Sequence, residues 1–251
     1  MKKFLIGLLM IGLIACLLIG CNVTTPSEGE GEGEGEDETT NRTVLVELFM
    51  SMGCPSCSVV EPILEQLAEE YDRTEMILVE EAGWGLYSTT EISDRYKWYL
   101  PSESDRATPN ILFNGLNQRI HGDSTYAAIK SKITTELGKD VNISINATRS
   151  SNSTTTTISG TIKNIGSSTL DNLVINGMTF RDRGQTGLKY SVIDIFEEQK
   201  VEVSTLNSGS SYNFSFTLED INWDLSNIHG VVFVQDTDSA KKEVLQSFYV
   251  D

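Results

Sequence analysis

The sequence predicts an α/β domain followed by an all-β domain, both placed behind an N-terminal export signal and a polar tether. Three observations indicate this order. Strand-like and helix-like patterns alternate over residues 43–139, short alternating apolar patterns fill residues 140–251, and residues 22–42 are almost entirely polar. A chain of 251 residues is long enough for two such domains. The expected segments are therefore residues 1–20, 21–42, 43–139 and 140–251.

The charge balance limits the partners that this chain can have. Lys and Arg number 19 and Asp and Glu number 36, which gives a net charge of −17. Nucleic acid and anionic lipid headgroups both attract clustered Lys and Arg, so neither is an expected partner. Hydrophobic residues make up 39% of the chain, enough to bury a core.

The N-terminus has the pattern of a secretory signal. Lys2 and Lys3 precede an apolar run that ends at Gly20, and Cys21 follows. The preceding residues Leu-Ile-Gly resemble the lipobox of prokaryotic lipoproteins, which implies cleavage before Cys21 and acylation of that cysteine. Cys16 offers a second, weaker match. The alternative is an uncleaved signal anchor, because the apolar run lies at the short end of a membrane span. Either interpretation places the rest of the chain outside the cytoplasmic membrane, on a solvated Gly-Glu tether.

The first domain begins with a strand that leads into a cysteine pair. The apolar run 44–50 predicts the strand, 51–53 breaks it, and Cys54-Pro-Ser-Cys57 opens a helical pattern. Unpaired N–H groups and the positive end of a helix dipole stabilise a thiolate at such a position. We therefore expect the pKa of Cys54 to fall from about 8.5 toward 7 or below. Cys57, one turn further in, is expected to be more buried.

The residues after the cysteine pair continue this pattern. Further strands are expected at 76–80, 111–113 and 118–121, and helices at 90–100 and 124–137. Asn114-Gly115 is a strong signal for a tight hairpin turn.

From about Thr43 to Lys139 the chain resembles the thioredoxin superfamily. The resemblance rests on the strand leading into Cys-x-x-Cys, on Pro62 five positions after Cys57, and on Thr108-Pro109 ahead of a strand and hairpin. It implies that Cys54 attacks a disulfide, that Cys57 resolves the mixed disulfide, and that a cis Thr108–Pro109 bond lets Thr108 pair with an extended client. The cysteine pair is then the redox centre, and no dissociable cofactor is expected.

Glu47 is the remaining candidate catalytic residue. A carboxylate within an apolar strand is costly unless it serves a purpose. The resemblance implies a buried acid in this strand that exchanges a proton with the inner cysteine. The alternative is a glutamate at the end of the strand that points to water. Pro55-Ser56 between the cysteines departs from the Gly-Pro of thioredoxin, so the direction of electron flow stays open.

A zinc site is not expected, because the chain outside the signal has few ligands of the kind zinc prefers. Besides Cys21, Cys54 and Cys57, the chain offers only His121 and His229. His229 lies in the second segment, and His121 is expected to be an ordinary polar residue near a strand end.

Residues 140–251 predict an all-β domain. Apolar residues alternate with polar ones at 141–147 and again at 212–218, and turn-forming residues separate most of the candidate strands, with 236–239 as the final hairpin. Seven or eight short strands fit an immunoglobulin-like sandwich, here without a disulfide. An anchored thioredoxin-like domain followed by a sandwich resembles a group of prokaryotic outer-membrane-type lipoproteins.

These patterns together predict a lipid-tethered, extracytoplasmic thiol–disulfide oxidoreductase. Its expected partners are protein thiol or disulfide clients and an unidentified redox partner. The alternative is a non-enzymatic binding or structural lipoprotein of the envelope, in which Cys54 and Cys57 form a permanent disulfide. Peroxide reduction is less favoured, because nothing in the sequence marks a dedicated peroxidatic site.

Overall fold

A computed structural model describes residues 41–251, except 86, 153, 185–186, 220–222 and 224–226. The predicted signal, Cys16, Cys21 and the tether up to residue 40 lie outside the described residues. Within the described part of the chain, no helix has the length and apolar character needed to cross a membrane.

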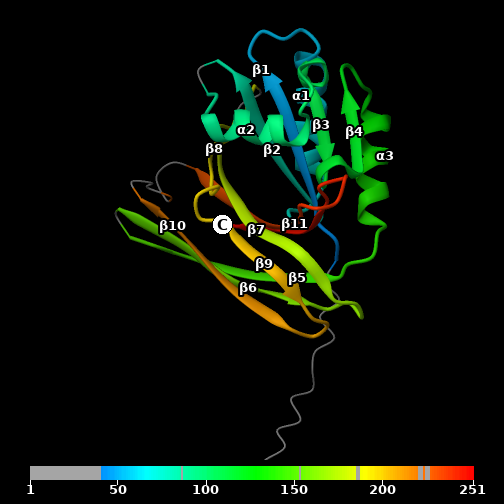
Figure 1. The fold of residues 1–251 in the computed structure, drawn as a ribbon. Helices are drawn as coiled ribbons and strands as arrows, with labels where there is room; N and C mark the ends of the chain where they lie inside the picture. The colour runs from blue at the N-terminus through cyan, green and yellow to red at the C-terminus, as the bar shows by residue number, and fades with distance from the viewer. Residues whose placement is uncertain (1–40, 86, 153, 185–186, 220–222, 224–226) are drawn as a thin grey trace, which may run out of the picture. The chain divides into compact units, whose positions relative to one another are not determined.

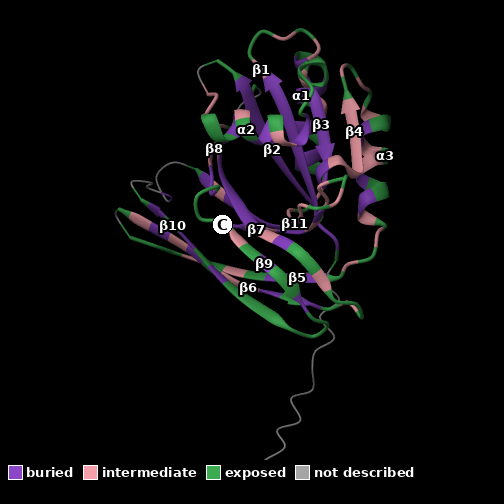
Figure 2. Ribbon diagram, in the orientation of Figure 1, coloured by how far each residue is buried: buried purple, intermediate pink, exposed green. Residues whose placement is uncertain are grey.

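Strands and helices alternate in the first half, as the sequence predicts. The elements are β1 (Val44–Ser51), α1 (Cys57–Glu70), β2 (Met76–Trp84), α2 (Thr90–Tyr99), β3 (Asn110–Phe113), β4 (Gln118–His121) and α3 (Tyr126–Leu137). Strand β1 pairs in parallel with β2 and antiparallel with β3, and β3 pairs antiparallel with β4 (Figure 1). This mixed sheet with its helices is a thioredoxin-like fold. Strands β1 to β3 are buried along almost their whole length, whereas edge strand β4 is only half-buried (Figure 2).

Helices α1 and α2 pack on opposite faces of β1. Leu48 of β1 belongs to the same core cluster as Val60 of α1. The next residue, Phe49, instead stacks on Tyr96 of α2, with ring centroids 4.3 Å apart. Successive side chains of a strand point to opposite faces. Leu48 and Phe49 therefore mark the α1 face and the α2 face of the sheet.

The second half consists of eight strands among the described residues. They are β5 (Ile143–Ser151), β6 (Thr155–Asn164), β7 (Leu170–Asp182), β8 (Tyr190–Ile195), β9 (Val201–Leu206), β10 (Ser211–Glu219), β11 (Ile228–Asp236) and β12 (Val244–Val250). Strands β10, β6 and β5 form a three-stranded antiparallel sheet. Its apolar side chains, such as Ile158 and Phe216, share one hydrophobic cluster with Val232 of β11. The two sheets are therefore packed through a common core.

The larger sheet of the second half continues into the sheet of the first half. Strand β8 pairs in parallel with β2 at Ser191 and Glu80, which produces a nine-stranded sheet that includes β12, β11, β7 and β9. On β11, Val232 faces the second-half core, while its neighbour Phe233 belongs to the core cluster of the first half. Both halves lie within one compact unit. Helices give way to strands near residue 140, yet the hydrophobic core continues across that point.

The loop between β3 and β4 also joins the halves. It runs from Asn114 to Asn117 and includes a short 3-10 turn. Leu116 N–H donates to the carbonyl oxygen of Lys241 at 2.8 Å, and Gly115 has a φ of 72°. A Cβ atom on Gly115 would lie 2.2 Å from the carbonyl oxygen of Lys242. Asn114 and Gly115 do have the two positive φ values of a tight hairpin turn. The loop is nevertheless longer than a two-residue turn, and the connection between β11 and β12 packs against it.

Candidate functional site

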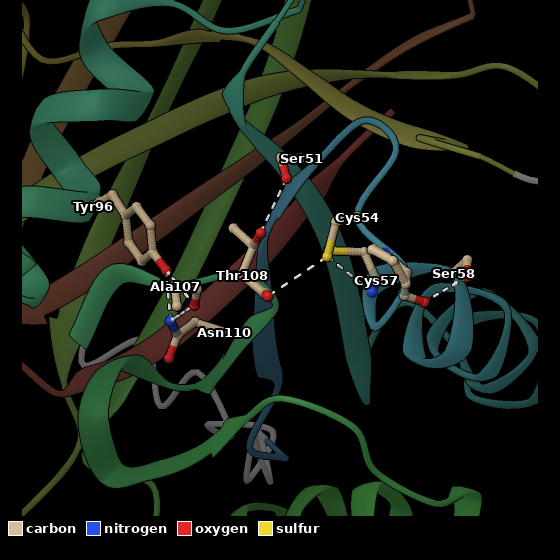
Figure 3. The surroundings of a disulfide bond; sticks show 9 residues. Ser51, Cys54, Cys57, Ser58, Tyr96, Ala107, Thr108 and Asn110 are labelled. Atoms are coloured by element: carbon tan, nitrogen blue, oxygen red, sulfur yellow. Dashed lines mark hydrogen bonds between the residues drawn. A yellow bond between two sulfur atoms is a disulfide. The ribbon is translucent and has the colours of Figure 1, made fainter. Parts of the chain in front are cut away.

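The cysteine pair lies at the first turn of α1. Cys54 N–H donates to the carbonyl oxygen of Ser51 at 3.2 Å, and α1 begins at Cys57. A disulfide joins Cys54 and Cys57 (Figure 3). Cys54 is half-buried, whereas Cys57 is 1% exposed. The Cys57 N–H donates to Cys54 Sγ at 3.1 Å, which is the contact that would stabilise a Cys54 thiolate after reduction.

The Thr108–Pro109 loop lies directly beside Cys54. The Thr108–Pro109 peptide bond is cis, and the Thr108 carbonyl oxygen is 3.5 Å from Cys54 Sγ (Figure 3). The hydroxyls of Ser51 and Thr108 are 3.0 Å apart, in hydrogen-bond contact. The Asn110 side chain also stabilises the loop, because its Nδ2 donates to the carbonyl oxygen of Ala107 at 2.6 Å. These contacts fix the loop backbone next to the disulfide.

A pocket of about 470 Å³ opens in front of the disulfide. Its lining comes from residues 50–55, from Cys57, Ser58 and Glu61 of α1, and from Tyr87, Arg183, Gly187 and Leu188. The last three belong to the connection between β7 and β8, in the second half of the chain. The Arg183 guanidinium lies 4.1 Å from the centroid of the Tyr87 ring, a cation–π contact. The second half therefore forms one side of the pocket in front of the disulfide.

Exposed apolar side chains lie on the elements around this pocket. Met52 is 58% exposed, Trp84 is 53% exposed and Val59 is 46% exposed. Met52 precedes Cys54 in its loop, Trp84 ends β2 opposite Ser51, and Val59 is on the first turn of α1. Large apolar groups exposed together mark surfaces that bind other molecules.

Glu47 is fully buried and points to the α2 face of the sheet. Its Oε1 accepts a hydrogen bond from Arg95 Nε at 2.5 Å, and its Oε2 accepts one from the Tyr99 hydroxyl at 2.8 Å. Burial lowers the pKa of Arg95, but Glu47, Tyr99 and Glu81 together raise it by more, so the net effect is an upward shift. Glu47 is thus not at a strand end in water. The structure gives it an ion pair with α2, and proton exchange with Cys57 stays a prediction.

Three further buried carboxylates, which the sequence did not single out, come together between α1 and β2, and one of them, Glu61, lines the pocket in front of the disulfide. Glu61 and Glu65 are on α1 and Glu80 is on β2, and one ligand oxygen from each lies within 4.8 Å of the others. Among the described residues, they form the one cluster that could hold a metal ion, and no metal site was expected. Two signals in the sequence could have found them. Glu61 and Glu65 lie four residues apart beside the apolar stripe of a helix, a spacing at which like charges repel. The apolar strand that begins at Met76 also runs into two acids, Glu80 and Glu81.

Burial raises the pKa of two of these acids. Desolvation is the largest cause for both Glu61 and Glu80, and the neighbouring carboxylates raise the pKa further. Backbone N–H groups act in the opposite direction, from Leu188 on Glu61 and from Tyr190 on Glu80. Glu61 and Glu80 therefore hold protons more tightly than ordinary glutamates do.

Comparisons with known proteins show a likeness to solved structures. No protein-family model matches the sequence, and no curated protein matches it. The structure is similar to HBP35 of Porphyromonas gingivalis, at 12% identity and a TM-score of 0.64, covering 84% of this chain and 75% of that chain. It is also similar to protein AGR_C_4864 from Agrobacterium tumefaciens, at 16% identity and a TM-score of 0.56, covering 83% of this chain and 94% of that chain. At these identities the likeness is one of fold alone.

A domain of the outer membrane lipoprotein Omp28 from Porphyromonas gingivalis aligns over a smaller part. It covers 45% of this chain and 89% of that chain, at 15% identity and a TM-score of 0.32, and nothing about this protein follows from so partial a match. The sheet order, the flanking helices and the cysteine pair together make up a thioredoxin-like fold with a Cys-x-x-Cys disulfide.

Proposed function

We propose that this protein is a thiol–disulfide oxidoreductase that acts on protein clients through Cys54 and Cys57. One observation carries the proposal. A half-buried Cys54 and a buried Cys57 form a disulfide at the start of α1, inside an open pocket, with the Thr108 carbonyl oxygen 3.5 Å from Cys54 Sγ. An exchanging disulfide needs an accessible attacking sulfur, a protected resolving sulfur and backbone groups that align the client.

The chemistry needs no dissociable cofactor. In the reducing direction, the Cys54 thiolate attacks one sulfur of a client disulfide and releases the other as a thiolate. Cys57 loses its proton, attacks Cys54 Sγ and releases the second client thiolate, so the client gains two electrons and the cysteine pair is oxidised. The oxidising direction is the reverse. A separate thiol or disulfide protein returns the pair to its starting state.

Thr108-Pro109 is proposed as the client-binding loop. An extended client segment can pair with the free edge of the Thr108 backbone, as an added strand does. Such a segment would then place its apolar side chains over the exposed rim of Met52, Trp84 and Val59. The rim supplies burial, while the backbone pairing supplies alignment with Cys54.

The remaining parts of the chain are proposed to place this site in the cell envelope. Residues 1–20 act as a lipoprotein signal, acylated Cys21 anchors the chain, and residues 22–42 hold the folded part off the membrane. Residues 140–251 form an immunoglobulin-like sandwich, which the two sheets packed around one core support. The contribution of Arg183 and Leu188 to the redox pocket supports a client-binding role for the sandwich rather than that of a simple spacer.

Trapping tests the proposal. In the full chain, Cys57→Ser leaves Cys54 without its resolving partner, and we expect mixed disulfides with envelope proteins to accumulate. The matched control is Cys54→Ser, which should trap far less because the remaining cysteine is buried. The reduction potential provides a second measure. A value well above about −300 mV supports exchange, whereas a value below it together with an empty trap means a permanent structural disulfide.

A further inference from the structure

The pocket in front of the disulfide has a single basic side chain on its wall. Of the residues that line it, only Arg183 is basic and only Glu61 is acidic. Arg183 directly follows β7, so this cation comes from the second half of the chain. Its guanidinium lies 4.1 Å from the centroid of the Tyr87 ring, which lines the same pocket. Stacking on a ring leaves the N–H groups at the edge of a guanidinium able to bind a ligand.

The Arg183 side chain has no partner of opposite charge. Its Nε is buried and has no hydrogen-bond partner. Within the described part of the chain, its guanidinium forms no ion pair with a carboxylate and donates to no carbonyl oxygen. Arg42 and Arg95 differ in this respect, because each pairs with a glutamate. A guanidinium left unpaired on a pocket wall is suited to an anionic group of a ligand.

The acid that lines the pocket does not neutralise this cation. Glu61 is only 7% exposed, and its Oε1 accepts a hydrogen bond from the Leu188 N–H at 2.6 Å. Its carboxylate is grouped with those of Glu65 and Glu80, between α1 and β2. Arg183, by contrast, is half-buried. The accessible charge in front of the disulfide is therefore positive, although the whole chain carries a net charge of −17.

The backbone around Arg183 fixes its place beside the pocket. The Arg183 N–H donates to the Lys189 carbonyl oxygen at 2.8 Å, which joins the two ends of the connection between β7 and β8. Leu188 of that connection is 4% exposed, and its N–H is bound to Glu61 of α1. Helix α1 also carries Cys57. Arg183 and the cysteine pair are thus held by the same packed elements.

We propose that Arg183 is a specificity-determining residue that binds a carboxylate beside the reacting sulfur, so that the preferred substrates are disulfides or thiols flanked by an acidic group. The inference rests on the proposed function and names its substrate class. A guanidinium binds a carboxylate through two parallel N–H···O bonds, which are stronger where water is partly excluded. Apolar lining from Met50, Pro55 and Leu188 excludes water in this pocket. Arg183 takes no part in the exchange of bonds or electrons, which stays with Cys54 and Cys57.

The size of the pocket limits where this carboxylate lies in a client. A pocket of about 470 Å³ has room for on the order of three residues of extended chain, at ~3.3 Å per residue. Cys54 and Arg183 both line it. The acidic group is therefore expected within a few residues of the client cysteine.

A series of small disulfides that differ in charge tests the proposal without a protein client. The full chain with Cys16→Ser and Cys21→Ser, in detergent, keeps Cys54 and Cys57 as its only thiols. The reduced protein is mixed with anionic dithiodipropionate, neutral hydroxyethyl disulfide or cationic cystamine, and loss of free thiol is followed with a maleimide reagent. Each rate is divided by the rate of the native Arg183 protein with the same probe, so differences between the leaving thiols cancel.

Arg183→Met should slow the reaction with dithiodipropionate about fivefold, since a partly exposed ion pair contributes a factor of this size. Hydroxyethyl disulfide should react at the native rate, which also shows that the variant is folded, and cystamine should react no more slowly. Arg183→Lys should keep part of the preference, because lysine retains the charge but lacks the planar fork. The matched control is Lys163→Met, which makes the same change in net charge at an exposed position on β6 and should leave all three rates unchanged.

A pair of peptides distinguishes a protein client from a small acidic thiol. Both are extended single-cysteine peptides joined as disulfide dimers, and they differ only in a glutamate or a glutamine beside the cysteine. If Arg183→Met slows the glutamate peptide more than the glutamine peptide, the recognised carboxylate belongs to a polypeptide client. If only dithiodipropionate is slowed, the substrate class is a small acidic disulfide.

Two results would overturn the inference. The first is equal slowing of the anionic and neutral probes in Arg183→Met, because Arg183 would then serve only the packing around Tyr87. The second is an unchanged rate with every probe and both peptides. A native chain that reacts with none of the disulfides would instead refute the proposed function, so the two failures are distinguishable.

Discussion

Arg95 is expected to be the most sensitive charged residue of the first half. Its guanidinium is buried, pairs with Glu47 at 2.5 Å and donates to the Tyr99 hydroxyl at 2.8 Å. Arg95→Met would leave the Glu47 carboxylate buried without its counter-charge. Removing one partner of a buried ion pair costs about 3–5 kcal/mol of unfolding free energy. We expect a loss in this range for Arg95→Met at neutral pH, measured by urea unfolding.

A second buried acid makes this loss dependent on pH. Burial and the Glu47 carboxylate raise the pKa of Glu81 well above its ordinary value, and Arg95 is the group that lowers it. Without Arg95 that pKa rises further. An acid with a raised pKa contributes stability that is present at low pH and is lost as the pH rises through the folded-state value. The cost of Arg95→Met should therefore be smaller near pH 5 than near pH 8.

Two companion variants complete the experiment. Lys97→Met removes an exposed ion pair with Asp94 on the same helix and should cost at most about 1 kcal/mol. Glu47→Gln combined with Arg95→Met should lose less than the sum of the single variants, because each single variant leaves one charge of the pair unpaired, whereas the double variant removes both. A loss below about 1 kcal/mol for Arg95→Met, or a cost independent of pH, would refute the idea that Arg95 is the counter-charge of this cluster.

Three further outcomes are expected. Gly115→Ala should lower the melting temperature more than Gly209→Ala. Both glycines have a positive φ, but of the two only Gly115 would place a Cβ against backbone, at the Lys242 carbonyl oxygen. Equal losses would contradict the close packing of Gly115 on Lys242. In Glu80→Gln the free energy of unfolding should fall less steeply as the pH rises above about 5, because the folded-state pKa of Glu80 is raised. Urea unfolding at several pH values measures this, and the same pH dependence in the variant and the native protein would contradict it. Met52→Ser should reduce kcat/KM for protein clients by roughly tenfold while sparing small disulfides, and an equal loss for both would remove the rim from client binding.

The order and boundaries of the elements could largely be predicted from the sequence, because local spacing encodes them. The spacing of Cys54 and Cys57 after an apolar run is enough to place them at the start of a helix. The Thr-Pro dipeptide ahead of a strand is a similarly local signal, and the cis bond at Pro109 agrees with it. In the second half, alternating apolar residues such as Phe214 and Phe216 predict a strand with one buried face, and β10 has that pattern.

The faces of the buried strands could not be predicted in this way. In β1 nearly every residue is buried, so alternation does not indicate which residues point to α1. The sequence therefore could not decide whether Glu47 faces Cys57. Only the packing of α2 on β1 shows that Glu47 faces Arg95. The same holds for β11, whose continuous apolar run reflects burial on both faces.

The sequence by itself determined the cysteine pair, its place at the start of a helix and the change from helices to strands near residue 140. The tertiary structure alone decided that the second half completes the pocket in front of the disulfide and that Glu61, Glu65 and Glu80 meet between α1 and β2. The physical reason is range. Strand and helix patterns depend on neighbours within a few residues, whereas a pocket depends on which distant segments the sheet register places side by side.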